Sequence, residues 1–166
     1  MSSKPLDPNP LDRENCLKLI SSSTVMTLAT QSRGRPWSAP VYYLFTDPEF
    51  YFFSSPDSRH VKEGENQYCG ASIFRDAPCF ENLEGIQMAG RIEPAPRDAE
   101  TMKIAWAYCR RHGVKIPGGT DPASQSGEIL KIFASAFHAR FYFFEPELIF
   151  YMDNTRGFGT RIKVEL

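Results

Sequence analysis

The chain has 166 residues, of which 42% are hydrophobic and 13% aromatic, enough for one domain with a sizeable core. Its 19 Lys+Arg and 20 Asp+Glu give a net charge of −1, so it lacks the basic footprint of a protein that binds duplex nucleic acid or an anionic membrane. Four widely spaced cysteines, with no CxxC pair, predict reduced thiols rather than a zinc site or a disulfide framework.

The N-terminal segment is polar and rich in proline, and it lacks the apolar stretch of a signal peptide. We expect residues 1–10 to form an extended arm and residues 11–166 to form a single domain. Together with the reduced cysteines, this favours a cytoplasmic location. Asp12 is expected to cap a first helix that ends by Ser22. The apolar positions of this helix recur at helical spacing: Cys16, Leu17 and Ile20.

Three strands are expected next, at residues 24–30, about 37–45 and 50–54. TVMTLAT alternates as a strand does, Gly34 permits a tight turn, and TDPE at 46–49 turns the chain again. Such consecutive antiparallel strands form a meander, which favours a barrel over a Rossmann sheet.

The second half of the chain alternates helices and strands. Asp98 and Gly113 are expected to cap and end the most clearly bounded helix. PGGTDPASQSG at 117–127 is expected to be a loop, either a connector or a lid. The other expected elements are a helix at 58–65, strands at 69–74 and 85–92, a short helix at 128–134, and strands at 137–144 and 148–152 interrupted at Glu145 and Pro146.

The segment YFFSSPDSRHVK at 51–62 predicts a phosphate site where a helix begins. The first N–H groups of a helix have no intrahelical partner, and the helix dipole is positive there. Ser58 can cap, Arg59 can bind phosphate oxygens through paired donors, Lys62 adds charge and His60 can add a hydrogen bond. The alternative interpretation is a capped helix with a solvated basic edge.

Pro40 lies inside a run that otherwise resembles a strand, and proline cannot donate to a ladder. The strand is therefore expected at an edge or to be bulged. The main-chain groups of Ala39 and Val41 could then bond a flat heterocycle, with a nearby tryptophan or tyrosine over its face. Ordinary edge protection is the alternative. In a meander this strand lies beside the one ending at Ser54, which would place the phosphate of such a ligand at the following helix.

No paired carboxylates, Ser/His/Asp order or glycine-rich nucleotide loop is recognisable, so a bound cofactor would have to carry any redox chemistry. The segment at 151–161 is typical of a hairpin turn, because its Asp, Asn and Gly residues tolerate left-handed conformations. In a functional interpretation, Phe158 and Arg161 reach a cofactor on a partner subunit.

Taken together, five segments resemble the flavin-binding split-barrel proteins related to pyridoxamine 5′-phosphate oxidase, and most closely the bacterial YhbP-like group. The resemblance covers nearly the whole chain from about Leu11. It implies a mainly β fold with flanking helices, built on a six-stranded antiparallel split β-barrel, and a homodimer with FMN at the subunit interface. The segments are LAT at 28–30, SAPVYYLF at 38–45, YFFSSPDSRH at 51–60, GIQMAGRIE at 85–93 and DNTRGFGTR at 153–161.

The resemblance also implies roles for residues of the phosphate segment. Phe53 and Ser54 match the strand end under the ribityl chain of FMN. Ser58 and Arg59 match the Ser-Arg pair at the FMN phosphate, and His60 stands where the oxidase has lysine.

Residues that would meet the flavin ring follow from the same resemblance. Ala39, Pro40 and Val41 match the strand that hydrogen-bonds the isoalloxazine. Gln87 lies in the strand that faces the ring, and Arg161 approaches it from the other subunit. The oxidase's residues for the pyridoxal phosphate group have no recognisable counterpart, so vitamin oxidation does not transfer with the fold.

These expectations favour an FMN-dependent oxidoreductase that acts on a small molecule. A flavin carrier or sensor without turnover is one alternative. The same barrel holding deazaflavin or haem is another, and haem would need an axial ligand such as His60, His138 or the helix-end His112.

Overall fold

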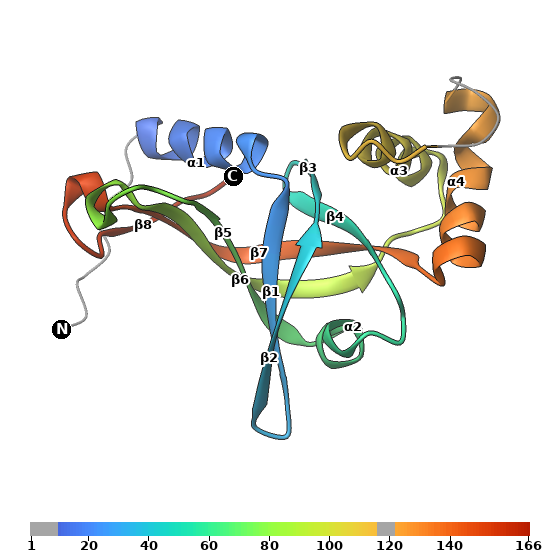
Figure 1. Ribbon diagram of the computed structural model, residues 1–166, viewed down its shortest axis with the longest axis horizontal. Coiled ribbons are helices and arrows are strands. Elements are labelled where there is room, and N and C mark those ends of the chain that lie inside the picture. The colour runs from blue at the N-terminus through green and yellow to red at the C-terminus, as the bar shows by residue number, and fades with distance from the viewer. Residues whose placement is uncertain (1–9, 116–121) are drawn as a thin grey trace.

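The computed structural model describes residues 10–115 and 122–166. One strongly curved sheet forms the body, with α1 along one side and α3 and α4 together at one end (Figure 1). In chain order the elements are α1 (Pro10–Ser22), β1 (Val25–Ser32), β2 (Arg35–Tyr42), β3 (Leu44–Thr46), β4 (Glu49–Ser54), α2 (Arg59–Gly64), β5 (Tyr68–Arg75), η1 (Phe80–Asn82), β6 (Glu84–Pro94), α3 (Ala99–Arg111), α4 (Pro122–Phe137), β7 (Arg140–Asp153), η2 (Asn154–Arg156) and β8 (Arg161–Lys163).

The sheet is antiparallel throughout its ladders, with strand order β2-β1-β5-β6-β7-β4-β3 and β8 paired to β7. The two end strands, β2 and β3, are separated in sequence by Tyr43 alone. The sheet must therefore curl until its ends meet at this residue, which makes it a half-barrel. Tyr43 is fully buried, and its hydroxyl donates to the Ile20 carbonyl at 2.6 Å.

Two hydrophobic clusters hold this architecture together. The larger one fills the curl of the sheet beneath α1, and β4 points Phe50 and Phe52 into it. The smaller one joins the other face of β4 to α3 and α4 through Tyr51, with Phe53 packed against it. This alternation follows from the two-residue period of a strand. Burial of aromatic rings on both faces is the main stabilisation of β4.

Several sequence expectations are confirmed. β1 and β2 form a hairpin whose turn contains Gly34 at φ 73°. Asp98 caps α3 by accepting from the Thr101 N–H at 2.8 Å, and Gly113 follows the helix at φ 65°. β2 pairs only with β1 among the described strands, so Pro40 lies on an edge strand.

The meander prediction is confirmed only in part. The end of the expected second strand, β3, pairs with β4, but β2 does not. The described sheet has eight strands rather than six, because the expected second strand divides at Tyr43 and β8 adds another. β2 and β4 are not hydrogen-bonded neighbours, since β4 lies between β7 and β3. Long-range pairing decided this order, and the turns between consecutive strands carry no signal for it.

The last long strand also differs from expectation. β7 runs without a break from Arg140 to Asp153, and a bulge in the β6–β7 ladder accommodates the interruption expected at Glu145 and Pro146. The register shifts between Ala89 and Gly90. A Cβ on Gly90 would lie 2.0 Å from the Glu145 carbonyl oxygen, so the bulge requires glycine there.

The start of the first helix and the start of α4 need correction, whereas α2 matches the helix expected at 58–65. Asp12 is not a cap: it lies buried in the first turn of α1 and pairs with Arg156. Residues 122–127 belong to α4 rather than to a loop, and residues 117–121 of the expected loop lie outside the described residues. The expected arm also lies outside them, apart from residue 10. None of the helices in the described ranges is both long and apolar enough to span a bilayer.

Candidate functional site

The junction of β4 and α2 gathers hydroxyls around one imidazole. Ser54 Oγ lies 2.7 Å from His60 Nε2 and 3.1 Å from Ser58 Oγ. Ser58 occupies the N-cap position, but its hydroxyl donates to the Ser55 carbonyl at 2.7 Å and does not cap the helix. The side-chain capping role expected for Ser58 is therefore wrong, and the first N–H groups of α2 do not donate to its hydroxyl.

His60 is partly buried at this junction. Desolvation lowers the pKa of its imidazole below the ordinary value of 6.5, so the ring is neutral at pH 7. It offers a hydrogen bond there but no charge.

Arg59 extends from α2 toward the β1–β2 hairpin. Its Nε donates to Glu63 Oε1 at 2.7 Å, its Nη2 donates to the Arg35 carbonyl at 3.2 Å, and its Cζ lies 4.7 Å from the Trp37 ring centroid. The Thr30 hydroxyl donates to the other oxygen of Glu63 at 3.0 Å. The hydrogen bond from Arg59 is the main reason that the pKa of Glu63 lies below its ordinary value.

A cavity of about 490 Å³ opens between this helix and the hairpin turn. Three guanidinium groups and one carboxylate line it, so its charge is positive overall. Its lining residues are Ser32, Arg33, Arg35, Arg59 and Glu63.

Lys62 points into a different set of contacts. Its Nζ pairs with Asp57 Oδ1 at 2.8 Å, and the other oxygen of Asp57 lies 3.1 Å from His138 Nε2. The Lys62 hydrogen bond, followed by that of His138, lowers the pKa of Asp57. Lys62 does not line the cavity beside Arg59.

The three residues of β2 expected to meet the flavin ring, at 39–41, alternate between buried and exposed positions. Ala39 and Val41 are buried, and Pro40 between them is exposed. Because β2 pairs with β1 alone among the described strands, the main-chain groups on its other edge have no ladder partner there.

Phe53 uses its side chain for packing. Its ring stacks on Phe133 with centroids 3.6 Å apart and planes 10° apart, and it also contacts Phe141 and Tyr108. A ligand at this end of β4 would therefore meet the main chain of Phe53 rather than its ring.

Gln87 and Arg161 contact each other. Arg161 Nε donates to Gln87 Oε1 at 2.9 Å, and both side chains are exposed. Figure 1 shows β8, which begins at Arg161, at the opposite end of the sheet from α4 and away from α2. Within one chain, Gln87 and Arg161 thus lie apart from the expected site residues at the start of α2.

Sequence reasoning missed several members of the positive cavity. Arg33 and Arg35 flank Gly34 at the β1–β2 turn, and a turn sequence carries no signal for an anion site. Glu63 could have been found, because a carboxylate four residues after Arg59 on a helix is a typical ion-pair spacing. The contact of Arg59 with Arg35 joins elements that are distant in sequence and has no local signal.

Comparison with known proteins gives a family for this architecture. A family model described as Pyridoxamine 5'-phosphate oxidase matches residues 13–140. No curated protein matches the chain in sequence.

Solved structures with the same fold are distant in sequence. Campylobacter jejuni ChuZ is 17% identical with a TM-score of 0.69, over 96% of this chain and 61% of that one. A heme-binding protein from Mycobacterium smegmatis is 16% identical with a TM-score of 0.66, over 95% and 59%. A FAD-binding protein from Mesorhizobium loti is 19% identical with a TM-score of 0.59, over 86% and 92%. At these identities the likeness shows a shared fold.

Proposed function

Because the chain belongs to the pyridoxamine 5′-phosphate oxidase family, we propose that it is a homodimeric FMN-binding protein and an oxidoreductase for a small molecule. The observation that carries the proposal is the cavity in which Arg33, Arg35 and Arg59 meet beside the start of α2. Assignment to the YhbP-like group is part of the proposal and rests on the five sequence segments.

The residues around this cavity suit a phosphate monoester. Three guanidinium groups against one carboxylate favour a dianion, and guanidinium binds phosphate through paired donors. Arg59 would exchange its bond with Glu63 for one with the phosphate. Ser54, Ser58 and neutral His60 lie at the adjacent junction and would supply uncharged hydrogen bonds.

The exposed hairpin supports a dimer. Figure 1 shows the turn of β1 and β2 projecting beyond the rest of the sheet. Residues 31–38 are exposed on both faces, and Trp37 keeps 44% of its surface exposed. Apart from the contacts of Arg59 with Trp37 and Arg35, this exposed two-stranded ribbon has little to stabilise it, and a second copy of the chain would cover it. The same dimer would bring Gln87 and Arg161 of one subunit to the cavity of the other.

The flavin would supply the redox chemistry when bound. The chain's own part is to hold the phosphate, to present the open edge of β2 to the ring and to exclude solvent. A carrier or sensor without turnover would use the same residues. Reduction of the bound flavin by NADH or NADPH in a stopped-flow measurement supports the oxidoreductase, and absence of reduction favours the carrier.

Haem fits the described histidines less well. Each of them already has a hydrogen-bond partner at Nε2. His60 Nε2 lies 2.7 Å from Ser54 Oγ, and His112 Nε2 lies 3.0 Å from the Tyr43 carbonyl oxygen. His138 Nε2 lies 3.1 Å from Asp57 Oδ2. An axial bond to iron through Nε2 would require one of these contacts to break.

A titration with FMN and with riboflavin tests the phosphate assignment. Riboflavin lacks only the phosphate, so we expect it to bind at least about tenfold more weakly than FMN. Arg59→Ala should weaken FMN binding by about tenfold or more and leave riboflavin binding nearly unchanged. Equal affinities for the two flavins would contradict the assignment.

A further inference from the structure

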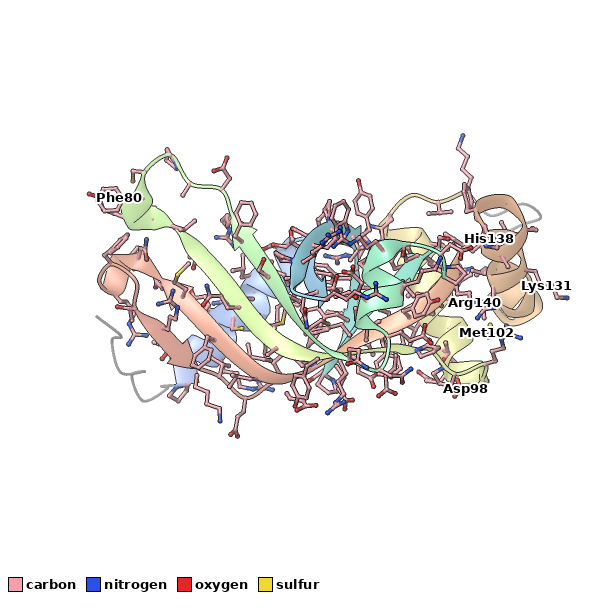
Figure 2. The ribbon with its side chains drawn as sticks, turned by 90° about the horizontal axis from the view of Figure 1, so that it is seen from below. Phe80, Asp98, Met102, Lys131, His138 and Arg140 are labelled. Atoms are coloured by element: carbon pink, nitrogen blue, oxygen red, sulfur yellow. The ribbon has the colours of Figure 1, made fainter. Side chains whose placement is uncertain are left out.

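A second cavity of about 490 Å³ lies at the helical end of the molecule. Its walls come from α3, α4, the end of β6 and the start of β7, with Pro56 at its edge. Figure 2 shows Met102, Lys131, His138 and Arg140 together at this end, beside α3 and α4. Its lining residues are entirely different from those of the proposed phosphate cavity.

Much of the lining is apolar. Each wall contributes apolar side chains to this surface. The cavity volume lies within the range of roughly 300–1,000 Å³ that is typical of small-molecule sites, so it can hold a ring or a short alkyl chain. The apolar residues that carry the argument are Pro94, Met102, Leu130, Ala134, Ala139 and Phe141.

The polar part of the lining is basic. Arg97, Lys131, His138 and Arg140 line the cavity, and no aspartate or glutamate does. Among the described residues, only His138 of these four has an acidic partner, Asp57.

Three cations with no acidic partner among the described residues repel one another around a space bounded by apolar side chains. A bound anion would relieve that repulsion. Solvent could do so as well, but a solvated basic edge does not require the adjoining apolar recess. The carboxylate of Asp98, at the start of α3, accepts from the Thr101 N–H at 2.8 Å and does not line the cavity.

We propose that this cavity binds a small molecule with an apolar body and one anionic group, such as a carboxylate or a phosphate ester. The apolar body would lie against Met102, Leu130 and Phe141, and the anionic group would contact Lys131 and Arg97 or Arg140. This site is separate from the proposed flavin site, and the inference does not depend on flavin binding.

The test uses anilinonaphthalene sulfonate, an apolar anion that fluoresces in apolar surroundings, with the full chain saturated in FMN. Octanoate should displace the probe at least about tenfold more effectively than octanol, which has the same chain without the charge. Lys131→Gln and Arg97→Gln should each weaken octanoate binding by about threefold to tenfold.

Two further variants separate this site from nonspecific binding. Ala134→Trp fills the recess from an exposed position on α4 and should abolish displacement. Lys103→Gln on α3 removes a cation that pairs with Glu100 and does not line the cavity, so it should change nothing. Circular dichroism and melting temperature confirm that each variant is folded. Equal displacement by octanol, or an unchanged octanoate affinity in folded Ala134→Trp, would overturn the proposal.

Discussion

Arg59 is held by Glu63: its Nε donates to the carboxylate at 2.7 Å, one turn along α2. The arginine side chain keeps 40% of its surface exposed, whereas that of Glu63 keeps only 11%. The carboxylate therefore competes directly with any phosphate for the guanidinium that the proposed site most needs.

This competition predicts that Glu63→Gln tightens FMN binding. Removing the carboxylate charge leaves Arg59 free to bind phosphate, and the gain should be about twofold to fivefold, as for an ion pair whose cation is partly exposed. Flavin fluorescence on titration measures the affinity. Glu65→Gln, just beyond the end of α2 and outside the cavity, is the matched control and should have no effect. An affinity unchanged or weakened in Glu63→Gln would show that this carboxylate does not compete.

The burial of His60 predicts a pH-dependent stability. Because its pKa is lowered in the folded chain, the unfolded chain binds this proton more readily. Stability is therefore full above the ordinary value of 6.5 and falls as the pH drops below it. His60→Gln removes that loss while keeping a hydrogen-bonding group near Ser54.

The measurement is the melting temperature at about pH 7.5 and about pH 5.5, on either side of the ordinary histidine pKa. The difference between the two should be smaller in His60→Gln than in the wild type. A residual difference is expected, because burial also lowers the pKa of His112. An identical difference in both proteins would contradict the assignment of a partly buried, neutral imidazole at position 60.

The bulge between β6 and β7 predicts that Gly90→Ala is severely destabilising. The new Cβ would meet main-chain atoms of Glu145 and Pro146, which cannot move without breaking the ladder. We expect a loss of at least about 3 kcal/mol in the free energy of unfolding. Denaturant titration measures it. Gly70→Ala on β5 is the control, since its Cβ would make only ordinary contacts at 3.6 Å or more; similar losses in both variants would refute the steric explanation.

Because the Phe53 ring stacks on Phe133, we expect its removal to lower the stability of the fold without weakening FMN binding. Phe53→Ala should lower the free energy of unfolding by about 3 kcal/mol, because the ring packs between β4 and α4. FMN affinity should change by less than about threefold, a difference below 1 kcal/mol. Phe137→Ala, at an exposed position on α4, should cost less than about 1 kcal/mol. A much larger loss of FMN affinity in Phe53→Ala would show that the ring itself contacts the cofactor.

Elements with strong local signals were predictable from the sequence. The β1–β2 hairpin follows from Gly34, and α3 follows from Asp98 and Gly113 at its two ends. The start of α4 was not predictable, because Pro, Ser and Gly at 122–127 are typical of a loop. Proline is nevertheless favourable in the first turn of a helix, and burial of Ile129 and Phe133 holds this one against the sheet.

The candidate site likewise contains parts that local sequence predicts and parts that it does not. The start of α2 and the edge position of Pro40 could be read from neighbouring residues in the sequence. The contact between Arg59 and the carbonyl of Arg35 spans 24 residues and depends on how the hairpin folds over α2. The packing of the Phe53 ring against α4 likewise depends on tertiary structure that no local pattern contains.

Sedimentation velocity of the chain with added FMN, recorded in the flavin absorbance band, tests the central proposal most directly. We predict that the flavin sediments with a species of twice the chain mass of 18.9 kDa, with one FMN bound per chain. Flavin that stays behind as free ligand, or a protein that sediments only at the mass of a single chain, would contradict a flavin site shared between two subunits.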